Sequence, residues 1–186
     1  MLGKMNKTNI KTALSKARKG IERYIEIMAL FHNTDVSQDL NFQKKFNGFY
    51  RIRQRSQDWY TVYYNYLEEQ KTKEPNFSQV SMYLDKKLRR YEPSFSSKFV
   101  ATHNPDKPIW DAFVLKNAEI KPPYYSSKTK VIKAIQVYAD LEKWYASFLL
   151  SPTGKMIIEI FENMVPEANK ISRIKKIDFV LWKNRA

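Results

Sequence analysis

The sequence contains no cysteine, and this absence excludes several kinds of site at once. Disulfide bonds, cysteine-ligated zinc, iron–sulfur clusters and a thiol nucleophile all require cysteine. The chain has only two histidines, too few for a histidine-rich metal centre. We therefore expect neither a bound metal nor a cofactor.

Glycine is also scarce, with four in 186 residues. Phosphate-cradling loops and turn-dense β-sandwiches need more, because their backbones adopt conformations that other residues avoid. No apolar run approaches the ~20 residues that cross a bilayer, so membrane insertion is not expected. Residues 1–19 are basic and lack the apolar stretch of a secretory signal, which predicts a cytoplasmic protein. Residues 1–6 are expected to be disordered or an extension of the natural start.

The sequence shows helical periodicity along most of its length. Apolar residues recur at steps of three and four over residues 10–28 and 131–148, which predicts two long amphipathic helices. A helix is also expected to start at Pro108 and to reach residue 118, because the first turn tolerates proline. Shorter helices are predicted at 39–50, 57–69, 78–90, 95–101, 152–165 and 174–182. About nine helices with short connectors predict a single all-α domain over residues 1–186.

The charge balance is strongly positive, with 33 Lys and Arg against 19 Asp and Glu, a net charge of +14. Such an excess favours a polyanionic partner, and we expect nucleic acid, DNA rather than RNA. A basic face that meets an acidic protein or a membrane surface is the alternative. The positive charge is concentrated in the first 25 and last 21 residues and in two tighter clusters, predicted to contact phosphates: Arg51, Arg53 and Arg55, and Lys86, Lys87, Arg89 and Arg90.

Residues 46–66 combine aromatic side chains with the first arginine cluster. Eight of these 21 residues are aromatic. Aromatic faces stack on exposed bases while arginine contacts phosphate, so the segment is a candidate nucleic-acid surface. Trp59, Tyr63 and Tyr66 share one helical face and are predicted to lie in the core. The tyrosines off that face are predicted to contact a ligand: Tyr50, Tyr60 and Tyr64.

Residues 90–114 contain a turn, a short helix with a lysine near its start, a loop, and the sequence PIWDAFV at 108–114. This arrangement resembles the helix–hairpin–helix DNA glycosylase superfamily. The resemblance implies a helical fold of two lobes, with Asp111 at the catalytic aspartate and Lys98 at the Schiff-base lysine. The family hairpin carries Gly-x-Gly, whereas the turn at residues 92–96 has no glycine. The hydroxyl groups that take its place are those of Ser94, Ser96 and Ser97.

The resemblance also implies a chemistry. The target base leaves the helical stack, Asp111 stabilises positive charge on the sugar, and Lys98 attacks C1′ as an amine whose pKa is lowered by burial and by Arg90. It further implies that the chain termini meet in one lobe, with residues 10–28 packed near residues 174–182. The oligomeric state is not predicted.

Three functions remain open from the sequence. The first is a DNA glycosylase-like base-excision or modified-base enzyme. The second is a non-catalytic DNA- or RNA-binding module, which the charge alone would support. The third is a protein-interaction module with a basic face. Whether the protein is an enzyme is therefore open at this stage.

Overall fold

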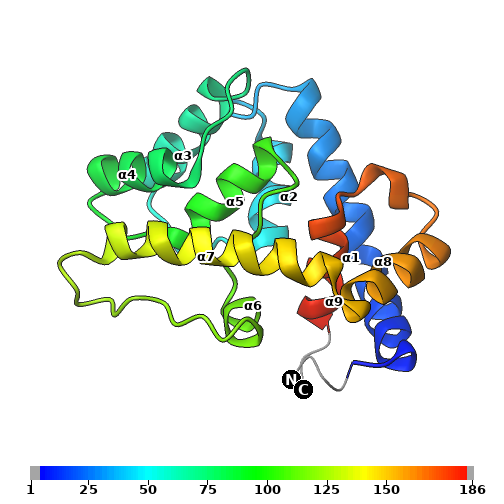
Figure 1. The fold of residues 1–186 in the computed structure, drawn as a ribbon. Coiled ribbons are helices and arrows are strands. Elements are labelled where there is room, and N and C mark those ends of the chain that lie inside the picture. The colour runs from blue at the N-terminus through cyan, green and yellow to red at the C-terminus, as the bar shows by residue number, and fades with distance from the viewer. Residues whose placement is uncertain (1–4, 184–186) are drawn as a thin grey trace.

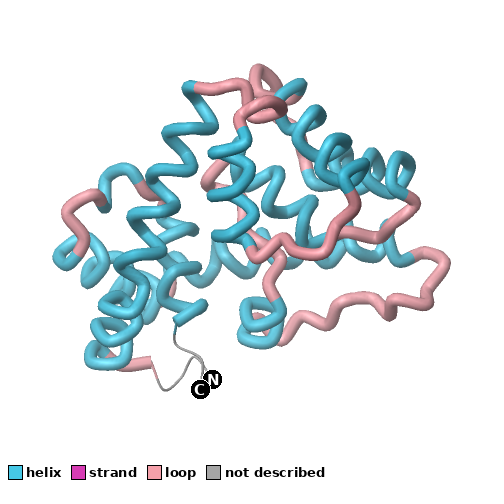
Figure 2. The backbone as a smooth tube through the Cα atoms, turned by 180° about the vertical axis from the view of Figure 1, so that it is seen from behind, coloured by secondary structure: helices cyan, strands magenta, loops and turns pink. Residues whose placement is uncertain are grey.

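A computed structural model describes residues 5–183, and all regular structure in that range is helical, which confirms the predicted all-α class (Figures 1 and 2). Residues 1–4 of the segment predicted to be disordered lie outside the described residues, and Asn6 caps the first helix. The described elements are α1 (Lys7–Asn33), α2 (Leu40–Tyr50), α3 (Gln57–Glu69), α4 (Phe77–Leu88), α5 (Pro93–His103), α6 (Ala112–Asn117), α7 (Lys130–Leu150), α8 (Pro152–Met164), the 3-10 turn η2 (Ala168–Lys170) and α9 (Arg173–Lys183).

The helices form two groups joined by α7, as Figure 1 shows. A terminal lobe contains α1, α8 and α9, and a middle lobe contains α3, α4 and α5. The long helix α7 contacts α4 near one end and α8 near the other. Helices α1 and α9 pack closely, with the Tyr24 and Phe179 rings 5.8 Å apart. The predicted packing of residues 10–28 near 174–182 is thus confirmed.

Local signals in the sequence set several helix ends. The Asn76 side chain accepts the N–H of Gln79, and the Gln79 side chain in turn accepts the N–H of Asn76, so a capping box starts α4. The side chain of Ser151 accepts the N–H of Gly154 at 3.0 Å, which starts α8 with Pro152 in its first turn. The chain therefore turns sharply from α7 into α8.

The middle lobe packs around aromatic side chains of α3. Trp59, Tyr63 and Tyr66 are buried as predicted, and the Trp59 and Tyr63 rings stack with centroids 4.8 Å apart. The Tyr63 hydroxyl donates to the carbonyl of Phe95 at 3.2 Å, because a buried hydroxyl needs a hydrogen-bond partner. This bond ties the start of α5 to α3.

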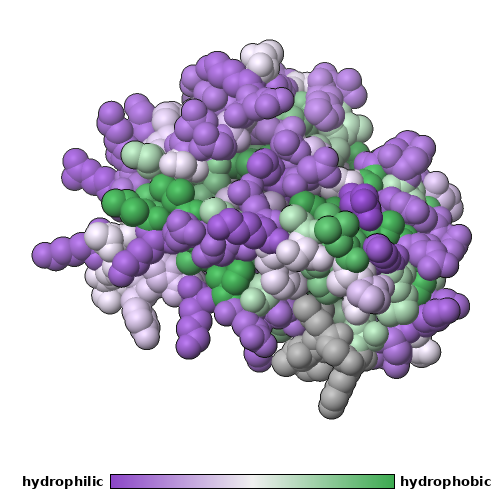
Figure 3. Space-filling view, in the orientation of Figure 1, coloured by the Kyte–Doolittle hydropathy of each residue, from purple (hydrophilic) through white to green (hydrophobic). Residues whose placement is uncertain are grey.

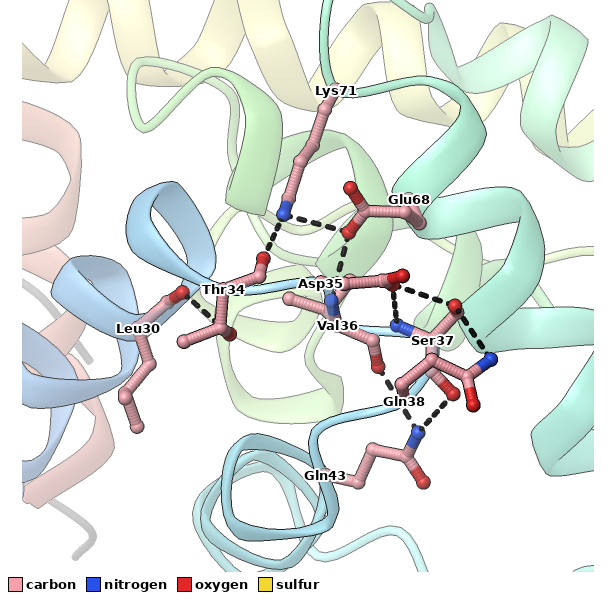
Figure 4. A network of polar contacts seen from close by, with 9 residues as sticks. All are labelled: Leu30, Thr34, Asp35, Val36, Ser37, Gln38, Gln43, Glu68 and Lys71. Atoms are coloured by element: carbon pink, nitrogen blue, oxygen red, sulfur yellow. Dashed lines mark hydrogen bonds and ion pairs between the residues drawn. The ribbon is translucent and has the colours of Figure 1, made fainter.

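A polar network fixes the turn between α1 and α2 (Figure 4). The Glu68 carboxylate accepts the N–H of Val36 at 2.8 Å and pairs with Lys71 at 2.6 Å. Lys71 also donates to the carbonyl of Thr34, and Gln43 donates to the carbonyl of Val36 at 3.0 Å. Residues at and after the end of α3 thereby hold the turn that leads into α2. This turn fixes the position of α2, whose last residues line the cavity described below.

The predicted helix over 108–118 is too long at its start. Helix α6 begins at Ala112, and Pro108, Ile109 and Trp110 lie buried in a non-helical segment. The backbone of this segment bonds elsewhere: the Tyr138 hydroxyl donates to the carbonyl of Pro108 at 2.8 Å. Because Asp111 caps the first amides of α6, the helix starts after Asp111 and not at the proline.

Among residues 5–183, no helix is both long enough and apolar enough to cross a membrane. An apolar strip is nevertheless visible in Figure 3 between α4 and the start of α7. Exposed Met82 and Ile132 lie along it.

Candidate active site between the two lobes

A cavity of about 750 Å³ lies between the terminal and middle lobes. Its walls come from α1, the end of α2, α5, the segment before α6, and α9. Lys98 and Asp111, the two predicted catalytic residues, both line it. Around them the cavity has six aromatic and five further basic residues: Phe49, Tyr50, Trp110, Phe113, Phe179 and Trp182, and Lys16, Lys19, Arg23, Arg51 and Lys183.

Lys98 projects from α5 into a partly apolar setting. Its Nζ donates to the Ser94 hydroxyl at 2.8 Å and lies 4.7 Å from the Phe95 ring centroid. Burial lowers the pKa of Lys98 to about 8, against the opposing effects of the Asp111 and Glu92 carboxylates. Roughly a tenth of this side chain is then a neutral amine at pH 7, far more than for an ordinary lysine.

The cause of this pKa differs in part from the sequence-based expectation. Burial is the main cause, as predicted, but the neighbouring cations that lower the pKa are Lys175 and Arg55. Arg90 instead pairs with Glu92 at 3.4 Å. The expected effect of Arg90 on Lys98 was therefore wrong, because Arg90 is exposed and engaged elsewhere.

Asp111 is held at the cavity wall by its role as a cap. Its Oδ1 accepts the N–H of Phe113 at 2.8 Å and that of Val114 at 3.4 Å. The carboxylate therefore lies at the N-terminus of α6, where the helix dipole favours a negative charge. Its negative charge attracts the Lys98 ammonium through space and raises the pKa of Lys98.

Two serines connect the lysine to the segment that carries the aspartate. The Ser94 hydroxyl accepts from Lys98 and donates to the carbonyl of Trp110 at 3.2 Å. The Ser97 hydroxyl accepts the N–H of Trp110 at 2.8 Å. Since Trp110 directly precedes Asp111, these bonds hold Lys98 and Asp111 in a fixed relation.

A fully buried ion pair lies behind the cavity wall. Lys175 and Asp178 of α9 are both 0% exposed, and Nζ lies 2.8 Å from Oδ2. The Tyr145 hydroxyl donates to the other carboxylate oxygen of Asp178. Lys175 also lies 5.2 Å from the ring centroid of Trp182, which lines the cavity. Burial raises the pKa of Asp178, and Lys175 opposes this shift.

Several side chains predicted to contact nucleic acid lie in the interior. Tyr64 is 1% exposed and its hydroxyl donates to Asn47 Oδ1 at 2.7 Å. Ser96 and Ser97 are 0% exposed, and their hydroxyls donate to the carbonyls of Glu92 and Ser94, respectively. Because α3 and α5 bury more than one face, these three side chains do not lie on the surface that a nucleic acid would contact. Tyr60 is half-buried, edge-on against Trp59.

The two basic clusters lie in different places. Of the first, exposed Arg51 lines the cavity and Arg53 is exposed nearby in sequence, whereas Arg55 pairs with Glu92 at 3.4 Å. The second cluster lies exposed at and just after the end of α4, outside the cavity: Lys86, Lys87, Arg89 and Arg90. The structure therefore does not bring the two clusters together at the cavity.

The cavity also includes basic residues that the sequence analysis did not single out. Lys16, Lys19 and Arg23 recur at steps of three and four, so they share one face of α1. Gly20 lies among them at the cavity wall. The spacing of these cations within the basic first 25 residues was the available signal.

Within residues 5–183, no group of three or more His, Asp or Glu side chains is placed to hold a metal ion. Comparison of the chain with protein-family models, curated proteins and solved structures gives no match.

Proposed function

We propose that this protein binds DNA and cleaves an N-glycosidic bond, with Lys98 as the amine nucleophile and Asp111 as the stabilising carboxylate. One observation carries the proposal: a lysine of lowered pKa and a capped carboxylate line the same cavity between two helical lobes. The resemblance of residues 90–114 to helix–hairpin–helix DNA glycosylases supports the same assignment.

The charge around the cavity suits a DNA backbone. Lys16, Lys19 and Arg23 supply positive charge from α1, and Arg51 and Lys183 supply it from α2 and α9. Cations arranged along one opening neutralise successive phosphates, and the release of counterions then drives binding. Binding of this kind weakens steeply as salt rises.

The reaction begins when a nucleotide leaves the stack and its base enters the cavity, at a cost of a few kcal/mol that contacts in the cavity offset. The aromatic walls provide surfaces on which a base stacks. The neutral Lys98 amine attacks C1′ while the bond from C1′ to the base nitrogen breaks. The bonding electrons leave with the base, which takes up the proton lost by the amine. The C1′–O4′ bond then opens, with O4′ taking up the second amine proton, to give an imine of Lys98. Water hydrolyses this imine, which frees Lys98 and leaves the abasic site. The Asp111 carboxylate stabilises the positive charge that develops on the sugar.

The test measures base release from duplexes that each carry one damaged or modified base. The wild-type protein is expected to produce abasic sites on at least one duplex. Lys98→Ala and Asp111→Asn are expected to lower the single-turnover rate about a hundredfold or more. Lys155→Ala, which removes an exposed lysine of α8 outside the cavity, is the matched control and keeps the wild-type rate. Wild-type rates in Lys98→Ala or Asp111→Asn would remove the assigned roles.

A non-catalytic binding module is the second candidate. The exposed basic cluster beyond α4 favours it, because those cations lie away from the cavity and fit binding without chemistry. The two candidates separate on base release, since only the first predicts it, whereas both predict affinity that falls with salt. A cytoplasmic location remains the expectation for either.

A further inference from the structure

A second cavity adjoins the first at Asp111. It measures about 560 Å³ and shares residues 110–112 with the first cavity. Lys116 and Lys121 supply positive charge to its walls, and Ile120 and Pro122 supply apolar surface. The second cavity thus continues from the candidate catalytic carboxylate toward the segment between α6 and α7.

That segment presents two adjacent tyrosines to solvent. Tyr124 is 86% exposed and Tyr125 is 67% exposed. Figure 2 shows the segment as a long loop that runs beside the helices. Two large neighbouring rings left in water are an informative feature, because most aromatic side chains of this chain are buried. An exposed aromatic ring is a stacking platform for an unpaired base.

Local contacts hold the tyrosines in place. The carbonyl of Tyr124 accepts the N–H of Ser127 at 3.0 Å, which closes a turn. The Lys130 Nζ donates to the carbonyl of Tyr125 at 3.0 Å and lies 4.5 Å from the Tyr125 ring centroid. The ring of Tyr91 meets that of Tyr125 edge-on at 6.0 Å. The backbone of the pair and the Tyr125 ring are therefore held on a braced turn, which reduces the entropy lost on binding.

The charge of the segment identifies the kind of partner. Residues 116–133 contain five lysines and one acidic residue, Glu119. Lysines stand on both sides of the tyrosine pair, at 121 on one side and at 128 and 130 on the other. Aromatic rings for bases between cations for phosphates form the arrangement that binds single-stranded nucleic acid.

We propose that Tyr124 and Tyr125, with the lysines that flank them, bind an unpaired segment of DNA strand beside the nucleotide that enters the first cavity. This inference rests on the proposed function, since it takes DNA as the partner. Extrusion of one nucleotide disrupts stacking of its neighbours, so the strand next to the cavity needs an alternative stacking surface. The second cavity shares residues 110–112 with the first, and its wall reaches Pro122, two residues before Tyr124.

The experiment compares binding of a 12-nucleotide oligothymidine and a 12-base-pair duplex by fluorescence anisotropy at 50 mM salt. The double variant Tyr124→Ala/Tyr125→Ala is expected to bind the single strand about 25-fold or more weakly, because each of two stacked bases contributes a factor of about five or more. Its duplex affinity is expected to change less than about threefold. The variant Tyr124→Phe/Tyr125→Phe keeps both rings and is expected to bind as the wild type does.

The matched control is Leu150→Ala, which removes a 70% exposed apolar side chain from the end of α7. Unchanged single-strand affinity in the double alanine variant would overturn the proposal that Tyr124 and Tyr125 bind unpaired DNA. The proposed function would still stand. An equal loss for single strand and duplex would overturn the assignment to unpaired DNA. Failure of the wild-type protein to bind either DNA would overturn both proposals.

Discussion

At the scale of single residues, the surroundings of Lys98 decide its chemistry. Burial makes the charged form costly and Asp111 partly restores it, so the pKa of Lys98 falls to about 8. Near neutral pH, a useful fraction of an amine with this pKa is in the neutral, nucleophilic form. That form remains basic enough to attack carbon. The same two influences can be separated by substitution.

We predict that acetic anhydride labels Lys98 with a rate that rises through pH 8, since only the neutral amine reacts. Because the Asp111 carboxylate raises the pKa of Lys98, Asp111→Asn should move the midpoint to lower pH while the asparagine still caps α6. Quantitative mass spectrometry of the labelled peptides measures both midpoints. A midpoint that stays in place or moves up in Asp111→Asn would contradict the electrostatic coupling.

This lowered pKa also affects stability. Between about pH 8 and the usual lysine range, the unfolded chain binds a proton that folded Lys98 has lost. This one group therefore makes the folded state more stable as pH rises through that window. Lys98→Met should raise Tm at pH 7. It should also flatten the rise of Tm with pH between about pH 8 and the usual lysine range, as measured by thermal unfolding. A lower Tm for Lys98→Met would argue against a costly buried ammonium.

The buried pair in α9 gives a second prediction at this scale. Lys175→Met leaves the Asp178 carboxylate buried without its cation, so the free energy of unfolding should fall by about 3–5 kcal/mol. The double variant Lys175→Met/Asp178→Leu removes both charges and should regain much of that loss. Urea unfolding measures each value, with Lys183→Met as the exposed control. A loss below about 1 kcal/mol for Lys175→Met would contradict the burial of the pair.

At the scale of helices, caps and close approaches decide where each element starts. The sequence signal at Ser151 and Pro152 was sufficient to predict the start of α8. The start of α6 could not be predicted in the same way, because Pro108 and Asp111 are both favourable at a helix start. The hydrogen bonds of residues 108–110 to α5 and α7 decide between them, and those partners are distant in sequence.

Two glycines with opposite surroundings test the close approach of α8 to α7. A Cβ atom on Gly154 would lie 2.0 Å from the carbonyl oxygen of Phe148, whereas nothing lies within 4 Å of one on Gly48. Gly154→Ala should therefore lower the free energy of unfolding by about 2 kcal/mol or more through overpacking. Gly48→Ala should raise it by about 0.5–1 kcal/mol, because alanine favours the helix. If chemical denaturation showed that both substitutions change the free energy of unfolding in the same direction, this geometry would be contradicted.

At the scale of the whole molecule, the periodicity of α1, α7 and α9 predicted these helices and most of the face that each one buries, but the periodicity of α3 did not. Tyr63 and Tyr64 are neighbours in sequence and both are buried, because α3 contacts other helices on two sides. A single apolar stripe therefore underestimates the core. The spacing of Lys16, Lys19 and Arg23 could place them on one face of α1. It could not show that this face borders a cavity, because the cavity draws on five separate parts of the chain.

The most direct test of a reactive amine between the lobes is peptide mapping of a borohydride-reduced adduct with DNA. The protein is incubated with duplexes carrying damaged or modified bases, reduced, digested and analysed by mass spectrometry. The account predicts an adduct on Lys98, absent from Lys98→Ala and formed more slowly by Asp111→Asn. An adduct on another lysine, or none with any damaged or modified base, would contradict it.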